Sequence, residues 1–280
     1  METILYAEVY FVCILVVAIV SFFEIRDGGD SSSDRWFKVM LGMFMLNFVS
    51  NFVFKLVNGG VLLDDSNHDM SYALKTLYHL TLCAGVFAWC GYADSEQGSG
   101  IFQRRQSLTV LLVPLALPVV IILLNLQNHL VFEISPDGAY LRHILFQAEM
   151  GYLLLGSGIM AVRLLLRTGR ESDPNQRSHM YLTATFPLCV AAAWAMSWVG
   201  EAFPVICVAI TFEILCLYIG GARNEVSMDK LTQVNNRQNL IGFMDYKMHN
   251  NSGHLYLLMI DVDEFKQIND NYGHLEGDEA

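Results

Sequence analysis

Residues 254–274 read HLYLLMIDVDEFKQINDNYGH, and this stretch decides the fold that we expect for the C-terminal part of the chain. The apolar run from Leu255 to Ile260 ends at Asp261 and Asp263, and a charged, helix-like segment follows directly. This order predicts a buried strand, a turn with carboxylates, and the start of a helix. Metals and phosphorylated ligands bind at such edges of α/β sheets, because backbone N–H groups and helix dipoles converge there. Carboxylates also follow apolar runs in proteins that bind no metal, so both interpretations are open at this point.

Two motifs around this stretch favour the ligand-binding interpretation. Residues 229–237, DKLTQVNNR, resemble the D-x-L-T-x-L-x-N-R opening of the GGDEF family of diguanylate cyclases. Residues 260–274, followed by Gly277 and Asp278, resemble that family's I-D-x-D-x-F-K-x-I-N-D-x-x-G-H-x-x-G-D motif. The two motifs stand in the family's order and at its spacing.

The resemblance covers residues 229–280 and nothing before them. Within it, Val234 stands where leucine is usual and Gln233 where glycine is frequent. The chain ends at Ala280, ahead of the place where the Gly-Gly-Asp/Glu-Glu-Phe turn of the family would follow. A complete domain of this kind needs more than about 100 residues. We therefore expect an incomplete catalytic domain, from a truncated polypeptide or a gene fragment, that is inactive alone and to which no catalytic residue is assigned.

The resemblance implies a fold, a reaction and a metal. The fold is the α/β, ferredoxin-like palm of nucleotide cyclases, here with its first elements only. The reaction is a nucleotidyl transfer that condenses two GTP molecules into cyclic di-GMP, with one GTP held by each subunit of a homodimer. At the matching positions, Asp261 and the Val262 carbonyl would bind Mg²⁺, which prefers such oxygen ligands.

The same resemblance implies a set of substrate-binding residues. Backbone N–H groups around Glu264 and Phe265 would hold the phosphates, and the Lys266 ammonium would contact them. Asn269 and Asp278 would hydrogen-bond the guanine edge. The other matching polar positions are expected to cap, turn or pack: Asp263, Asp270 and His274.

The composition predicts a membrane protein. Hydrophobic residues make up 54% of the chain and charged residues only 16%, and the mean hydropathy is +0.38. A net charge of −11 with no basic patch argues against a nucleic-acid-binding protein. All six cysteines fall inside apolar stretches without metal-ligand or disulfide spacing, so we expect them to be packing residues.

Seven apolar stretches have about the 20 residues that a transmembrane helix needs. They are Ile4–Phe23, Trp36–Val57, Tyr72–Tyr92, Leu108–Leu126, Ile144–Leu166, Met180–Val199 and Phe203–Ile219. The first lacks the basic start and the cleavage site of a secretory signal, so we expect it to be retained.

Basic residues in the flanks predict the orientation, because short loops rich in Lys and Arg stay in the cytoplasm. One set of flanks holds eleven basic residues: Arg26, Arg35, Lys38, Arg104, Arg105, Arg163, Arg167, Arg170, Arg177, Arg223 and Lys230. The other set holds three: Lys55, Lys75 and Arg142. The prediction is a multi-pass protein of the plasma membrane, with its N-terminus outside and its C-terminus in the cytoplasm. The outer loops are short, and the loop over 127–140 contains a Ser-Pro-Asp-Gly turn.

Ionisable residues inside the spans are costly and therefore informative. Glu8, Lys55 and Lys75 lie toward the outer surface, where the simplest interpretation is that they extend their charged groups to the interface. His79 and Glu149 lie deeper, which leaves open whether they line a ligand-binding or proton-sensing pocket. Glu213 in the last span is expected to pair with a polar group on a neighbouring helix, such as Asn47 or Asn51; alternatively, it gates the signal that leaves the bundle.

The domain organisation follows from these segments. We expect a sensor domain at 1–220, a short linker at 221–228 and the GGDEF segment at 229–280. The Gly220-Gly221 pair is expected to break the helix or act as a hinge. Residues 237–249 are predicted to form a helix with an apolar face made by Leu240, Ile241, Phe243, Met244 and Met248.

The function favoured by the sequence is a membrane-bound diguanylate cyclase under the control of a seven-helix sensor. A rival is a non-enzymatic membrane receptor whose degenerate cytoplasmic tail binds a nucleotide or a partner protein. A third hypothesis is a small transporter, which the lack of repeats or broken-helix pairs in the spans weakens.

Overall fold

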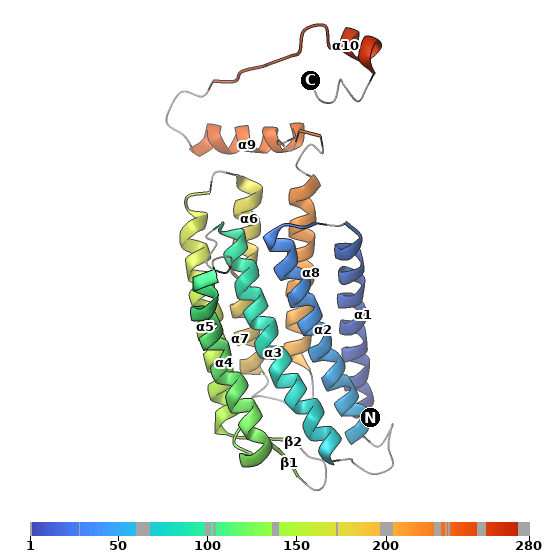
Figure 1. The fold of residues 1–280 in the computed structure, drawn as a ribbon, viewed down its shortest axis with the longest axis vertical. Coiled ribbons are helices and arrows are strands. Elements are labelled where there is room, and N and C mark those ends of the chain that lie inside the picture. Colours follow the sequence, from blue (N-terminus) through green and yellow to red (C-terminus); the bar gives the residue numbers. More distant parts are fainter. Residues whose placement is uncertain are drawn as a thin grey trace.

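The helices form an elongated bundle with the N-terminus at one end and the C-terminal segment beyond the other (Figure 1). The computed structural model describes residues 2–27, 29–59, 68–98, 102, 105–135, 140–171, 173–196, 204–226, 231–232, 234, 236–250 and 256–273. The bundle contains α1 (Glu2–Asp27), α2 (Ser32–Asn58), α3 (His68–Glu96), α4 (Arg105–Asn128), α5 (Ile144–Thr168), α6 (Pro174–Thr183), α7 (Phe186–Met196) and α8 (Val205–Val226).

Within the described residues, the predicted apolar stretches coincide with these helices, with one difference; positions 197–199 and 203 of the last two stretches lie outside the described residues. The sixth stretch, 180–199, is divided between α6 and α7 by a turn at Ala184 and Thr185. Pro187 lies in the first turn of α7 and has no N–H to donate to the Thr183 carbonyl, so a continuous α-helical ladder cannot form there.

Four of the described helices are long and apolar enough to cross a membrane, which suggests a membrane protein. They are Leu5–Arg26, Ser32–Asn58, Ile144–Thr168 and Val205–Ala222. The crossing of the other three predicted stretches stays a prediction.

The core of the bundle is centred on the contact between α2 and α3. At Gly85, an added Cβ would lie 2.8 Å from the Phe44 ring, and at Gly91 it would lie 2.4 Å from the Trp36 ring. Glycine at these positions therefore lets the two helices approach closely. Trp89 is fully buried and stacks on Phe186 of α7, with ring centroids 4.9 Å apart.

The two ends of the bundle carry different structures. At one end, an antiparallel hairpin of β1 (Phe132–Ile134) and β2 (Tyr140–Arg142) connects α4 to α5. At the other end, α9 (Arg237–Asn250) lies across the bundle and contacts α6, and α10 (Phe265–Tyr272) lies beyond it (Figure 1). We call these the hairpin end and the α9 end.

Two expectations for the C-terminal part are wrong. First, α8 runs through Gly220 and Gly221 as far as Val226, so the glycine pair does not break the helix, and its action as a hinge stays a prediction. A glycine costs a helix only about 1 kcal/mol, and packing against α6 compensates for this cost.

Second, the described part of the predicted strand, residues 256–260, is extended but belongs to no sheet. Its side chains are 63–88% exposed. A strand is stable only when neighbouring strands bond to its backbone and cover its apolar side chains. Among the described residues, the only paired strands are those of the distant hairpin.

Candidate functional site

The residues predicted to bind magnesium lie in the exposed segment between residue 256 and α10. Asp261 and Val262 are both exposed, and the Val262 N–H donates a hydrogen bond to Asp261 Oδ1 at 3.0 Å. A carboxylate and a neighbouring carbonyl are the hard oxygen donors that Mg²⁺ takes, usually together with waters and substrate phosphates. Within the described ranges, no group of three or more His, Cys, Asp or Glu side chains could hold a metal. These two donors therefore suit part of a magnesium shell, with substrate oxygens as the complement.

The predicted phosphate-binding residues form the start of α10. Glu264 is the residue before the helix and has a left-handed backbone conformation with φ of 55°. This turn directs the chain from the extended segment into the helix, whose first N–H groups have no partner inside the helix and suit an anion. Phe265 and Lys266 are exposed in that first turn, and Asn269 is half-buried one turn later. The candidate substrate residue Asp278 and the motif residue His274 lie outside the described residues.

The predicted helix at 237–249 is present as α9, but its expected apolar face is not covered. Leu240, Ile241 and Met248 are 42–61% exposed, while Phe243 and Met244 are half-buried.

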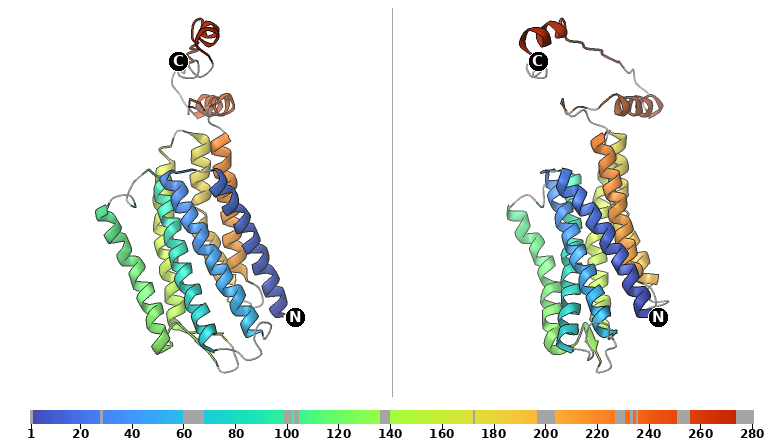
Figure 2. Two further views of the ribbon diagram at one scale, coloured as in Figure 1. Left: turned by 45° about the vertical axis from the view of Figure 1, so that its right-hand side comes forward. Right: turned by 90° about the vertical axis from the view of Figure 1, so that its right-hand side faces the viewer.

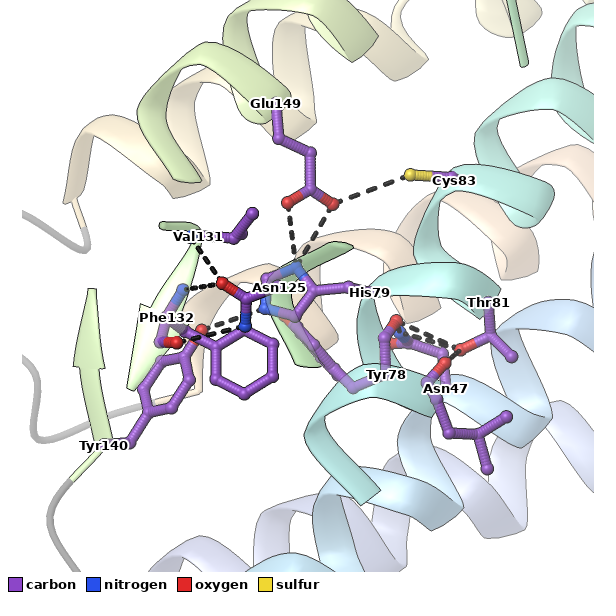
Figure 3. Close-up of polar contacts among 11 residues, drawn as sticks. Asn47, Tyr78, His79, Thr81, Cys83, Asn125, Val131, Phe132, Tyr140 and Glu149 are labelled. Atoms are coloured by element: carbon purple, nitrogen blue, oxygen red, sulfur yellow. Dashed lines mark hydrogen bonds and ion pairs between the residues drawn. The ribbon is translucent and has the colours of Figure 1, made fainter. Parts of the chain in front are cut away.

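The structure brings the two candidate sensor residues into direct contact (Figure 3). His79 of α3 and Glu149 of α5 are 0% and 6% exposed, and His79 Nδ1 lies 2.9 Å from Glu149 Oε2. On the other side of the ring, His79 Nε2 lies 3.0 Å from the Tyr140 hydroxyl of β2. The ring also stacks on Phe132 of β1, with centroids 5.1 Å apart. This buried cluster therefore links two helices to the hairpin.

Lys75 belongs to the same region and is not at the interface, so that interpretation is wrong for this residue. Its side chain is 5% exposed, and the ammonium donates to Asn51 Oδ1 of α2 at 2.5 Å. The ammonium also lies over the rings of Phe54, Tyr78 and Tyr140 at 4.1–5.0 Å from their centroids. An aromatic cage and a carbonyl oxygen satisfy a buried cation inside the bundle. By contrast, Glu8 is exposed, as expected, and Lys55 is half-buried over the Tyr6 ring.

The expected partners of Glu213 are wrong, although its partners do lie on neighbouring elements. Glu213 accepts a hydrogen bond from Thr185 Oγ1 at 3.1 Å and one from Cys189 Sγ at 3.6 Å. Asn47 instead donates to the Tyr78 carbonyl, and Asn51 to the Tyr10 hydroxyl. Glu213 therefore ties α8 to the turn between α6 and α7.

A further polar contact at the α9 end was not expected from the sequence. His179 of α6 is 4% exposed, and its Nδ1 lies 3.0 Å from Glu96 Oε2 of α3. Its Nε2 lies 3.2 Å from the Tyr92 hydroxyl and 3.4 Å from the Leu217 carbonyl of α8. The ring packs against Gly220, where an added Cβ would lie 2.8 Å from it.

This contact favours the protonated form of His179. Burial lowers the pKa of His179, but the hydrogen bond that its Nδ1 donates to Glu96, the negative charge of Glu96 and the Leu217 carbonyl raise it by more, so the pKa lies above its ordinary value. His179 stands immediately before the sixth apolar stretch, beside a cavity of about 260 Å³ that Glu24, Asp34 and Glu96 also line. The signal in the sequence that points to His179 is an ionisable residue directly before an apolar stretch.

The C-terminal segment matches a known family. Residues 226–280 match the family model described as "Diguanylate cyclase, GGDEF domain". The C-terminal segment is therefore similar to a GGDEF domain, and we call it the GGDEF segment. This GGDEF segment is also similar to the diguanylate cyclase DgcZ of Escherichia coli (strain K12), with 43% identity over 53 residues. That match covers 19% of this chain and 18% of the length of DgcZ.

Proposed function

We propose that the chain is part of a membrane-bound diguanylate cyclase that condenses two GTP molecules into cyclic di-GMP under the control of its helical bundle. The observation that carries this proposal is the family match of residues 226–280, which contain the aspartate, lysine and asparagine of the family's nucleotide-binding motif. Four candidate membrane spans in the same chain support the location in a membrane.

Each nucleotide-binding residue has a role that its chemistry supports. Asp261 and the Val262 carbonyl would hold magnesium, which would supply neutralisation of the charge that develops on the transferred phosphate. The first N–H groups of α10 hold phosphate oxygens, and Lys266 adds a mobile positive charge. Asn269 and Asp278 orient the guanine. A homodimer brings two such sites together, each with its own GTP.

The orientation in this proposal places the N-terminus outside and the GGDEF segment in the cytoplasm, where GTP is present. The excess of basic residues in one set of flanks supports it. The bundle ends lie accordingly: the hairpin end with the buried His79–Glu149 pair is outside, and the α9 end is inside. A stimulus that changes the packing around this pair would alter the alignment of two GGDEF segments through α8.

The experiment that tests the enzymatic proposal uses the protein from its complete reading frame, purified in membranes with GTP and Mg²⁺. Formation of cyclic di-GMP is measured for the wild type, for Asp261→Asn, and for Asp30→Asn as a matched control that makes the same change at an exposed position ahead of α2. We expect product from the wild type and the control, and a loss of at least 100-fold for Asp261→Asn. GTP binding without any product would favour the rival receptor.

The regulatory proposal has its own test. The bundle is replaced by an unrelated dimerising membrane anchor, and the rate of cyclic di-GMP formation is compared with that of the intact protein. Control by the bundle would be refuted if the anchored protein and the intact protein had equal rates under every condition that changes the activity of the intact protein.

A further inference from the structure

An apolar cavity lies between α3, α4 and α5, and at Cys83 its wall borders the His79–Glu149 cluster. Its volume is about 380 Å³, and its walls are almost entirely hydrocarbon. Residues that line it include Val86, Phe87, Leu115, Pro118, Leu155 and Ile159. Figure 2 shows that α4 leans away from the rest of the bundle toward its first residues, so that the helices on either side of the cavity diverge.

The surroundings of the cavity indicate what fills it. The α5 side chains at its rim face outward, with Leu155 65% and Ile159 55% exposed, on a helix that is a candidate membrane span. In a bilayer this side of the bundle is covered by lipid, and an apolar cavity does not hold water. A hydrocarbon chain is then the natural occupant. The volume lies near the lower end of the roughly 300–1,000 Å³ found for small-ligand pockets, which suits one chain.

One charged residue lies on the cavity wall and indicates the polar end of the occupant. Arg163 of α5 lines the cavity and is half-buried, and it donates to Met160 Sδ at 3.9 Å. This position is five residues before the end of α5 at Thr168, or about 7.5 Å along the helix axis. The guanidinium is therefore close to the membrane surface on the α9 side, where it suits a carboxylate with two parallel hydrogen bonds.

We propose that this cavity binds a single-chain fatty acid, with its alkyl chain between α3, α4 and α5 and its carboxylate on Arg163. The inference goes beyond the proposed cyclase function and requires only that the bundle lies in a membrane. The test measures binding and not catalysis, so its failure would leave the cyclase proposal intact.

Two glycines of α5 provide a matched pair of variants. An added Cβ at Gly156 meets no atom within 4 Å, and Gly156 lines the cavity, so the side chain in Gly156→Phe starts from open space and would occupy part of the cavity. Gly151 is equally free of neighbours and is exposed on the same helix, but it is not part of the cavity wall. Gly151→Phe is therefore the control for Gly156→Phe. Arg167→Gln, at an exposed position one turn from Arg163, is the control for Arg163→Gln.

The experiment places the full chain in phosphatidylcholine nanodiscs with palmitic acid that carries a photoreactive diazirine on its chain. Cross-linked peptides are identified by mass spectrometry, with unlabelled palmitic acid, hexadecanol or phosphatidylglycerol as competitors. We expect saturable labelling of α3 and α5, competition by palmitic acid, and at least tenfold weaker competition by hexadecanol. Saturable labelling should disappear in Gly156→Phe and weaken at least tenfold in Arg163→Gln, while both controls label like the wild type.

Several results would overturn the proposal. The first is labelling that spreads without saturation over all lipid-facing helices. The second is labelling of Gly156→Phe at the wild-type level. The third is competition by phosphatidylglycerol equal to that by palmitic acid, because this would identify an ordinary membrane lipid as the occupant. The thermal unfolding midpoint of each variant is measured in parallel, so that a variant that fails to fold is replaced by Gly156→Leu.

Discussion

Removal of the carboxylate from the buried His79–Glu149 pair should destabilise the bundle in a measurable way. In Glu149→Leu, His79 Nδ1 loses its partner at 2.9 Å on a ring that is 0% exposed. Neutral hydrogen bonds between membrane helices contribute about 0.6 kcal/mol on average and up to about 1.7. A hydrogen bond to a charged group contributes about 1.5–3 kcal/mol. We therefore expect a decrease of about 2 kcal/mol in the free energy of unfolding.

The assay is reversible unfolding in detergent micelles, with a double-mutant cycle that combines Glu149→Leu and His79→Leu. Glu149→Gln keeps an acceptor at the same position and should cost less than half as much. Asn47→Leu, which removes a neutral contact to the Tyr78 carbonyl, serves as the reference at about 0.6 kcal/mol. The reasoning fails if Glu149→Leu costs no more than Asn47→Leu, or if the cycle gives no coupling between the two residues.

Two further predictions concern the α9 end. Gly220→Ala should destabilise the bundle by about 1–3 kcal/mol, because its Cβ would lie 2.8 Å from the His179 ring. Gly221→Ala, whose Cβ would lie 3.9 Å from the same ring, should be nearly neutral. Equal unfolding midpoints for the two variants would contradict this prediction. The raised pKa of His179 means that its protonated form stabilises the fold, so its contribution is complete below about pH 6.5, the ordinary histidine pKa, and is lost as the pH rises through the higher folded-state pKa. The unfolding midpoint should thus fall over this pH interval in the wild type and stay flatter in His179→Gln, and a parallel decline in both proteins would assign the pH effect to other groups.

The sequence predicted those parts of the structure that depend on local pattern. Apolar runs of the length of a membrane located the helices, and the D-x-D and lysine-asparagine motif located the family segment, because each is contained in one continuous stretch. His79 and Glu149 were singled out because both are ionisable within apolar runs, but no local pattern shows that residues from α3 and α5 meet.

Features that depend on partners distant in the sequence were missed or misjudged. Lys75 was wrongly expected at the interface. The three rings that enclose its ammonium lie on three separate elements, so the local sequence does not show that they meet. The β1–β2 hairpin on either side of 136–139 is marked in the sequence only by the short alternation of apolar and charged residues at Phe132, Glu133 and Ile134. The segment 256–260 has the apolar pattern of a strand but no partner strand among the described residues. Such a pattern alone does not predict a sheet, because a strand is stable only where another strand pairs with it.

The uninterrupted course of α8 through its two glycines has a geometric consequence. A continuous helix transmits rotation as well as translation, and each residue inserted after Ala222 would turn the end of α8, as far as Val226, by about 100° and advance it by about 1.5 Å. If the rate of cyclic di-GMP formation depends on how the two GGDEF segments of a dimer face each other, it should rise and fall with the length of the insertion. The rate should return to its original value after seven residues, which complete nearly two turns. The rotation of the GGDEF segment about the axis of α8 would then affect cyclase activity more than its distance from the bundle does.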